Sequence, residues 1–281
     1  KLCLGIVKLN LYVMSRIVEK YAELPKPLRK PLWQWWHRTM NRYDGENAAN
    51  FMNYGFEVLN GEKRPQLVNG DETNRYCIQL YDHVVNRENL NGKLVLEVGS
   101  GRGGGASYIT RYYKPKSYVG LDISESSIEF CNDHYNVDGL TFKCGIAEKL
   151  PFADQTFDYV VNVESARCYN DMLAFFKEVY RVLKKDGKLL IADMIYPKEL
   201  EQFRTRFENA GFSVKHETNI SSNVVAALGK DSERREHLID TKAPKILRSS
   251  FKTFAGTVGT SRYNNFATGV FQYWSFVLEK K

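Results

Sequence analysis

The sequence has few cysteines and no pattern that would pair them or bind a metal. Five cysteines are scattered among 281 residues without a C-x-x-C spacing, and the five histidines include no H-E-x-x-H pair. Neither a disulfide framework nor a zinc site is therefore expected, and a reducing compartment such as the cytoplasm fits this usage. The sequence predicts no metal cofactor.

Long uncharged hydrophobic runs are also lacking. The most apolar stretch, residues 2–24, contains five charged side chains, whereas a membrane-spanning helix needs roughly 20 nearly uncharged residues. A secretory signal fits poorly too, because no small-residue cleavage site follows this stretch. The sequence therefore predicts no spanning helix.

Acidic residues are scarce in the first 45 positions, where nine Lys and Arg stand against three Asp and Glu. Leu2, Ile6, Leu9 and Val13 recur at helical spacing, and residues 32–38 (LWQWWHR) interleave tryptophans with cations. This combination is typical of a segment that lies at a membrane surface. The alternative is a lid that packs on the chain's own domain. We treat residues 1–45 as a separate segment and 46–281 as one domain.

Residues 93–195 alternate apolar strands with helical patterns, which predicts a doubly wound, mostly parallel α/β sheet with right-handed crossovers. Further elements flank this half and bring the predicted sheet to seven strands. A helix is predicted at 73–85, another at 198–210 and a strand from Phe212. A helical stretch at 222–252 and a final edge strand at 271–278 follow. Residues 220–265 are expected to cap a substrate pocket.

A glycine-rich loop follows the first strand of this half, at residues 97–103 (EVGSGRG). Glycines at the tip of a parallel strand allow a sharp turn and a close approach by a ligand. Asp122 ends the next strand about 20 residues on, where a ribose-binding acid is expected. The alternative role for Asp122 is the N-cap of the following helix.

The loop has the E-x-G-x-G-x-G form of class I S-adenosylmethionine-dependent methyltransferases, one residue shorter than the nicotinamide pattern. Residues 147–152 (AEKLPF) and 157–162 (FDYVVN) resemble the adenine-binding turn and fourth strand of that superfamily, and residues 182–189 resemble its helix-to-strand connection. The resemblance implies that S-adenosyl-L-methionine is the cofactor. It implies cofactor contacts from Glu97, Gly99, Ser100, Gly101, Asp122, Ile123, Ala147, Glu148 and Asn162. Glu97 would orient the loop or accept a hydrogen bond from the amino group of the cofactor.

Within that superfamily, residues 50–280 are most similar to the phthiotriol/phenolphthiotriol dimycocerosate methyltransferases, lipid O-methyltransferases of mycobacteria. The likeness rests on residues 103–108 (GGGASY), 162–169 (NVESARCY) and 259–263 (GTSRY). A more distant likeness is to sterol C-methyltransferases, which also carry a Glu after the fourth strand. The resemblance implies methyl transfer to a hydroxyl of a small lipid-like, isoprenoid or polyketide acceptor.

The chain departs from this pattern in two places. The adenine turn reads Gly145-Ile146-Ala147-Glu148 where the family has Gly-Asp-Ala-Glu, so Glu148 or a backbone carbonyl would replace the aspartate. Arg167 stands where related enzymes carry a His, and an arginine keeps its proton. The proton acceptor must therefore be another residue.

Candidate catalytic residues are Glu164 and Tyr169 beyond the fourth strand, with His37 and Tyr54 from the leading segment. The alternatives are that Glu164 pairs with Arg167 and that Tyr169 belongs to the core. Aromatic residues of the C-terminal region are candidates for contact with an apolar acceptor, namely Phe251, Phe254, Tyr263, Phe266, Phe271, Tyr273 and Trp274.

Three other functions remain open. Methylation of a sterol or prenyl double bond would suit the missing His. A nucleic-acid methyltransferase would suit the net charge of +7, but residues 162–165 read NVES where amino-methylating enzymes of that kind carry Asn/Asp-Pro-Pro-Tyr/Phe. A scaffold that only retains the fold conflicts with the intact glycine loop. We therefore expect a lipophilic small-molecule substrate and no nucleic-acid partner, and the sequence indicates no oligomeric state.

Overall fold

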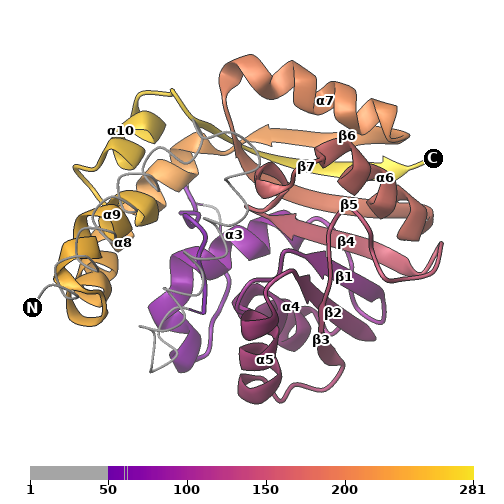
Figure 1. The fold of residues 1–281 in the computed structure, drawn as a ribbon, viewed down its shortest axis with the longest axis horizontal. Coiled ribbons are helices and arrows are strands. Elements are labelled where there is room, and N and C mark those ends of the chain that lie inside the picture. The colour runs from indigo at the N-terminus through magenta and orange to yellow at the C-terminus, as the bar shows by residue number, and fades with distance from the viewer. Residues whose placement is uncertain (1–49, 60, 62) are drawn as a thin grey trace, which may run out of the picture.

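A computed structural model describes residues 50–59, 61 and 63–281 of the chain. Its centre is one seven-stranded sheet in the order β3-β2-β1-β4-β5-β7-β6 (Figure 1). Strands β1 to β5 pair in parallel, and β7 runs antiparallel to both β5 and β6. The strands are β1 Leu94–Val98, β2 Ser117–Asp122, β3 Leu140–Cys144, β4 Phe157–Val163, β5 Leu183–Ile195, β6 Phe212–Asn219 and β7 Gln272–Lys280.

Helices connect the strands and lie on both faces of the sheet (Figure 1). The α-helices are α3 Arg75–Val85, α4 Gly104–Tyr113, α5 Glu125–His134, α6 Met172–Val182, α7 Leu200–Asn209, α8 Ser221–Lys242, α9 Arg248–Ala255 and α10 Ser261–Ala267. Short 3₁₀ helices are η2 Asn69–Asn74, η3 Ala166–Cys168, η4 Pro197–Glu199 and η5 Lys245–Leu247. The predicted doubly wound sheet is thereby confirmed.

The sheet is covered on both faces because alternate residues of its strands are apolar on both sides. Leu190 and Ala192 of β5 face a core that includes residues of α3 and α4, whereas Leu189 and Ile191 face a core that includes α6 and α7. This is the period of two expected of a strand. The inner strands therefore read as nearly continuous apolar runs, as in other sheets buried on both sides.

Helix α6 illustrates how local sequence defines an element. The Asp171 side chain accepts a hydrogen bond from Ala174 N at 3.0 Å and so caps the helix. Its buried residues recur at helical spacing on the face that meets the sheet, namely Phe175, Phe176, Val179 and Val182.

The predicted edge position of the last strand is wrong. Strand β7 lies between β5 and β6, and β6 is the edge of the sheet. The physical reason is burial on both faces: Tyr273, Phe276, Val277 and Leu278 of β7 are all at most 5% exposed. Strand β6 instead carries exposed residues such as Lys215 at its centre, as is typical of an edge.

The predicted helical stretch at 222–252 consists of the long helix α8, the turn η5 and the helix α9. Helix α10 was not predicted, although its N-cap is visible in the sequence, where the Thr260 side chain accepts from Tyr263 N. Figure 1 shows α8, α9 and α10 together at one end of the sheet. These helices lie within the predicted cap region, residues 220–265, except for the end of α10.

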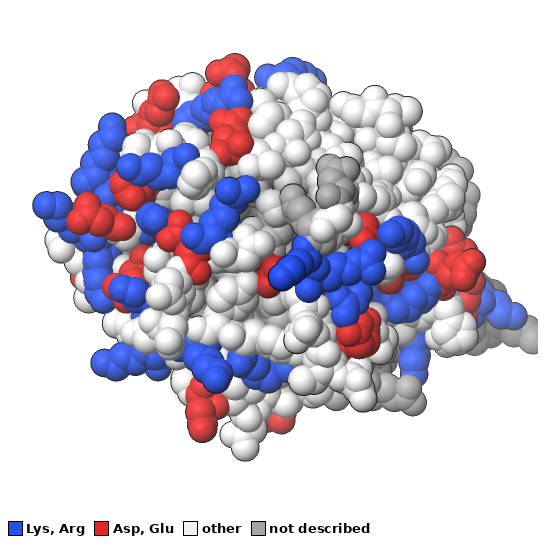
Figure 2. All heavy atoms as spheres, turned by 180° about the vertical axis from the view of Figure 1, so that it is seen from behind, with Lys and Arg blue, Asp and Glu red and all other residues white. Residues whose placement is uncertain are grey.

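Charged side chains of opposite sign lie side by side on the face shown in Figure 2 and do not form a patch of one sign. No helix in the described part of the chain is long and apolar enough to cross a membrane. Within the same residues, no group of His, Cys, Asp and Glu side chains is arranged to hold a metal ion.

Candidate active site

The loops that follow β1, β2 and β4 lie together, because the carboxyl ends of parallel strands are on the same side of the sheet. Strand β1 pairs with β2 on one side and with β4 on the other. The strand order therefore changes direction at β1 and β4, which is where open α/β sheets bind ligands. This arrangement brings together the glycine loop, Asp122 and Glu164.

The Asp122 carboxylate holds the glycine loop against the end of β2. Its Oδ2 accepts from Gly101 N at 2.9 Å, and its Oδ1 accepts from Ser124 N at 2.9 Å. The alternative N-cap role is wrong, because the Ser124 side chain caps α5 by accepting from Ser127 N. Each carboxylate oxygen has a second lone pair, so Asp122 can still accept from ribose hydroxyls.

Two glycines of the loop make room for the chain's own side chains. A Cβ at Gly99 would lie 2.3 Å from Ser165 Oγ, and a Cβ at Gly101 would lie 3.3 Å from the Met52 methyl carbon. Both residues have positive φ angles, +82° and +53°, which favour glycine. Ser165 and Met52 therefore pack directly on the loop at which the cofactor is predicted to bind.

Glu97 lies beneath this loop and is fully buried. Its carboxylate accepts from Tyr81 OH at 2.9 Å and from Tyr118 OH at 3.0 Å. Burial raises the pKa of Glu97 to about 7, although the two tyrosine hydroxyls act in the opposite direction. Both bonds come from side chains outside the loop, so orienting the loop and accepting from the amino group of the cofactor both stay predictions.

Glu97 gives a prediction for stability against pH. The folded state binds its proton more tightly than the unfolded chain, so the free energy of unfolding should fall as the pH rises from about 4.5 to about 7. The full effect is on the order of 3 kcal/mol, at about 1.4 kcal/mol per pKa unit. Urea titrations across this range should show a flatter profile for Glu97→Gln. Glu125→Gln, at an exposed position of α5, should keep the wild-type profile; an unchanged slope in Glu97→Gln would contradict the assignment.

The residues predicted to contact adenine lie after β2 and β3. Ile123 and Ile146 are large apolar side chains that remain 37% and 45% exposed, whereas Ala147 is buried. The Glu148 carboxylate accepts from Asn170 N at 2.9 Å, so it also ties this turn to the segment after β4. Exposed apolar side chains beside Asp122 could pack against the flat faces of an adenine ring.

Asn162, Ser165 and Tyr169 form one hydrogen-bonded group at the end of β4. Asn162 Nδ2 donates to Val98 O at 2.8 Å and to Ser165 Oγ at 2.7 Å, and Ser165 Oγ lies 3.0 Å from Tyr169 OH. Asn162 therefore joins β4 to the start of the glycine loop. Burial raises the pKa of Tyr169 far above its usual value, so the hydroxyl keeps its proton and is poorly suited to act as a base.

Glu164 is the first residue after β4 and has an unusual backbone conformation, with φ +53°. Such angles are costly for a residue with a side chain and cluster at functional sites. The peptide is held by Glu164 N, which donates to Ala192 O at 2.9 Å. Glu164 Oε1 accepts from Tyr54 N at 2.7 Å and from Tyr273 OH at 2.8 Å. The backbone thus directs this carboxylate between the leading segment and β7.

Burial raises the pKa of Glu164 to about 8, and the bonds from Tyr54 and Tyr273 only partly offset this effect. The alternative pairing with Arg167 is wrong. Arg167 Nη2 lies 3.4 Å from Glu199 Oε2, and its Nη1 donates to Met194 O. Glu164 therefore has no cationic partner in an ion pair within the described part of the chain, and it can exchange a proton near neutral pH.

Residues 96–191 match a family model described as a methyltransferase domain. Phthiotriol/phenolphthiotriol dimycocerosates methyltransferase from Mycobacterium leprae is 36% identical over 236 residues, which cover 83% of this chain and 87% of that protein. A fatty-acid O-methyltransferase from Mycolicibacterium smegmatis is 39% identical over 215 residues, covering 75% and 77%. The chain belongs to the family of phthiotriol/phenolphthiotriol dimycocerosates methyltransferases.

The fold of this methyltransferase is found in solved structures as well. The structure of a protein described as a putative sarcosine dimethylglycine methyltransferase, from Galdieria sulphuraria, superposes with a TM-score of 0.69 at 15% identity, covering 87% of this chain and 98% of that one. The protein is an enzyme of the S-adenosylmethionine-dependent class, and S-adenosylmethionine is its cofactor.

The residues present fit that cofactor. Ser100 Oγ and Asn162 Oδ1 are buried near the carboxyl ends of β1 and β4, and neither has a hydrogen-bond partner among the described residues. Asp122 offers acceptors for the ribose, and Ile123 offers an apolar face for the base. We propose that these residues would hold the cofactor of the methyltransferase.

Several residues of this site were not predicted, or were predicted in another role. Tyr273, a candidate for contact with the acceptor, donates a hydrogen bond to Glu164, and this role was not predicted. Arg235 of α8 was not predicted, although it continues the apolar stripe of Val224 and Leu228 with Asp231 at helical spacing, a pattern that could have indicated a buried ion pair. His37 lies outside the described residues.

Proposed function

We propose that this enzyme transfers a methyl group to a hydroxyl oxygen of a lipid-like acceptor, and that Glu164 accepts the proton that the hydroxyl loses. The observation that carries this proposal is a carboxylate at the switch point of the sheet whose pKa is raised to about 8. A base with a pKa near the working pH combines a useful ionised fraction with a strong affinity for the proton.

Two relatives of this enzyme support a lipid-like acceptor. One acts on phthiotriol and phenolphthiotriol dimycocerosates and another on fatty acids, as their names state. Both names describe molecules with long apolar chains. We infer that this chain takes an acceptor of the same kind.

When bound, S-adenosylmethionine supplies an activated methyl group on a positively charged sulfur. The remaining task for the protein is to place an oxygen in line with that methyl group, to exclude water and to receive one proton. Tyr54 N and Tyr273 OH both bind Glu164 Oε1. No donor among the described residues reaches its Oε2, which leaves that oxygen for the acceptor hydroxyl.

Methylation of a carbon–carbon double bond is the second candidate. The Tyr54 and Phe266 rings meet edge to face with centroids 5.0 Å apart, and Tyr54 N binds Glu164. Aromatic faces and a carboxylate could stabilise a carbocation. This chemistry would need no base for the first bond to form.

The predicted membrane contact of residues 1–45 lies outside the described residues and stays a prediction. We propose a peripheral position on a membrane surface for this segment, because a lipid-like acceptor would be met there. A cytoplasmic location fits that position.

Incubation with S-adenosylmethionine carrying an isotopic methyl label would test the proposed reaction. We expect label in a methyl ether when long-chain alcohols or a lipid extract are supplied, which mass spectrometry of the product would identify. Label in a carbon-bound methyl group would favour the second candidate. Label in a methyl ester only would reject the hydroxyl acceptor.

A further inference from the structure

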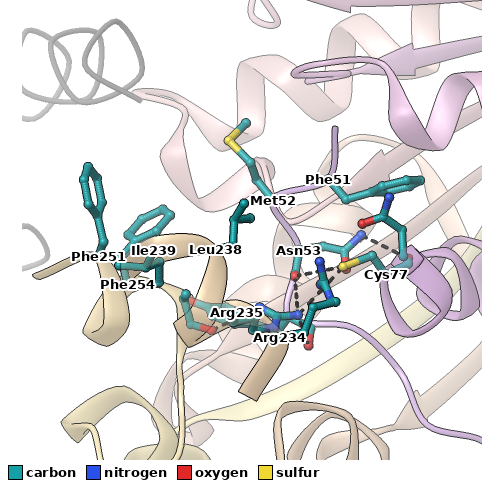
Figure 3. Close-up of a pocket in the computed structure, with 13 residues that line it drawn as sticks. Phe51, Met52, Asn53, Cys77, Arg234, Arg235, Leu238, Ile239, Phe251 and Phe254 are labelled. Atoms are coloured by element: carbon teal, nitrogen blue, oxygen red, sulfur yellow. Dashed lines mark hydrogen bonds between the residues drawn. The ribbon is translucent and has the colours of Figure 1, made fainter. Parts of the chain in front are cut away.

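A pocket lies between helices α8 and α9 and the segment of residues 51–54, which we call the leading segment (Figure 3). Leu238 and Ile239 come from α8, Phe251 and Phe254 from α9, and Phe51 and Met52 from the leading segment. The six side chains are apolar, and five of them remain partly exposed.

The two walls of this pocket belong to separately packed units. Phe251 forms a small core with Ala243 and Leu247, against which Ile239 and Phe254 pack. Phe51 on the opposite wall packs against the main core of the sheet. The pocket is therefore a seam between two apolar units.

The wall formed by residues 51–54 is shared with the site of methyl transfer. Tyr54 lines the pocket, and its backbone nitrogen donates to Glu164 Oε1 at 2.7 Å. Met52 also lines the pocket, and its methyl carbon packs on Gly101 of the cofactor loop. Two residues of this wall therefore contact both the pocket and the residues of the candidate active site.

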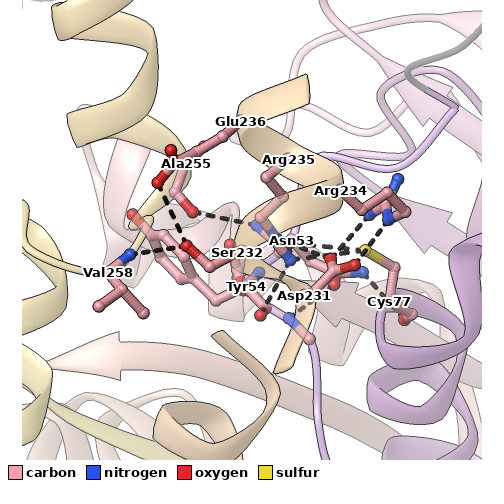
Figure 4. A network of polar contacts seen from close by, with 12 residues as sticks. Asn53, Tyr54, Cys77, Asp231, Ser232, Arg234, Arg235, Glu236, Ala255 and Val258 are labelled. Carbon is pink, nitrogen blue, oxygen red and sulfur yellow. Dashed lines mark hydrogen bonds and ion pairs between the residues drawn. The ribbon is translucent and has the colours of Figure 1, made fainter. Parts of the chain in front are cut away.

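The two arginines of the pocket are bound to other groups of the protein (Figure 4). Arg235 donates to Asp231 Oδ2 at 2.8 Å, and to the carbonyls of Ala255, Asn53 and Tyr54 at 3.0–3.1 Å. Arg234 binds both oxygens of the same Asp231. Both guanidinium groups bind Asp231, and Arg235 also binds backbone carbonyls. We therefore expect the pocket to bind apolar groups and not anions.

We propose that this pocket holds the alkyl chain of the acceptor and thereby limits the chain length that the enzyme accepts. The inference rests on the proposed function, because it assigns the pocket to the same acceptor. A saturated chain suits a seam lined by aliphatic and phenyl groups.

The test uses the full chain and a probe that does not depend on methyl transfer. 11-(Dansylamino)undecanoic acid fluoresces strongly in apolar sites, and its titration reports binding of an alkyl chain. Ile239→Trp should fill the pocket and weaken this binding roughly 10- to 200-fold, the range for misfit in an apolar pocket. Phe254→Ala should widen the pocket and shift methyl transfer toward longer alcohols in a graded series.

Val214→Trp is the matched control, because Val214 is a 39% exposed residue of the edge strand β6. The control should bind the probe as the wild type does, and all variants should bind S-adenosylhomocysteine unchanged by calorimetry. Equal binding by Ile239→Trp and wild type, or no binding by the wild type, would overturn the proposal. If the probe binds but no alcohol is methylated, the proposed alkyl-binding role of the pocket is supported and the hydroxyl acceptor is rejected.

Discussion

Glu164→Gln is expected to lower kcat by roughly 10²- to 10⁴-fold, the contribution typical of a positioned general base. The amide has nearly the shape of the carboxylate, but it cannot accept the proton of the acceptor hydroxyl. The bonds from Tyr54 N and Tyr273 OH can be kept by the amide oxygen. Single-turnover rates with saturating cofactor and acceptor would measure the loss.

The same variant should lose the pH dependence of the wild type. A base must be ionised, and the pKa of Glu164 is raised to about 8 by burial. The wild-type rate should therefore rise tenfold per pH unit below 8 and level off above it, whereas the Gln variant should show no such rise. A rate that falls as the pH rises through 8 would instead mean that Glu164 acts in its protonated form.

Tyr273→Phe is the matched control for this pH effect. It removes the hydroxyl that donates to Glu164 Oε1 at 2.8 Å and leaves the ring in the core. Loss of a bond to the ionised carboxylate should raise the pKa of Glu164 further, so the rise in rate should move to higher pH. Calorimetry should find unchanged binding of S-adenosylhomocysteine in both variants. A Gln variant with wild-type kcat would exclude Glu164 as the proton acceptor.

Arg235→Met should lower the free energy of unfolding by about 3 kcal/mol, the lower end of the range for removing one partner of a buried ion pair. The lower end applies because Asp231 keeps its bonds to Arg234. The variant also removes the guanidinium hydrogen bonds to the carbonyls of Ala255, Asn53 and Tyr54 (Figure 4). Urea denaturation followed by circular dichroism would measure the midpoint and the slope.

Arg234→Met gives a matched comparison on the same helix and the same carboxylate. The Arg234 side chain is 31% exposed, against 10% for Arg235, so its loss should cost about 1 kcal/mol or less. Equal losses in the two variants would show that the contacts of Arg235 with the backbone of residues 53–54 and of α9 do not stabilise the fold.

The sequence predicted much of the architecture because its signals are local. Strands and helices of residues 93–195 follow from apolar periodicity, and the structure has the same alternation. The cofactor loop and Asp122 were found because they follow consecutive strands of one sheet. Their meeting is a consequence of parallel pairing, which the β-α alternation already indicates.

Contacts between distant elements could not be predicted in the same way. Strand β7 was expected at the edge, because nothing in its own residues specifies two partner strands. The bonds to Glu164 come from positions 110 residues before and 109 residues after it. Arg235 donates to carbonyl groups of residues 53 and 54. Every residue has a backbone carbonyl, so the sequence does not show which of them will accept this bond.

The position of β7 has a consequence for how the chain folds during synthesis. Among the described residues, strand β6 pairs only with β7, and α8, α9 and α10 lie between the two strands in the sequence. While these 52 residues emerge from the ribosome (220–271), β6 and one side of β5 have no partner, and unpaired strands invite contacts with other nascent chains. Slow translation of the cap would prolong this exposure, whereas the arrival of β7 closes the sheet and delivers Tyr273 to Glu164 in one step.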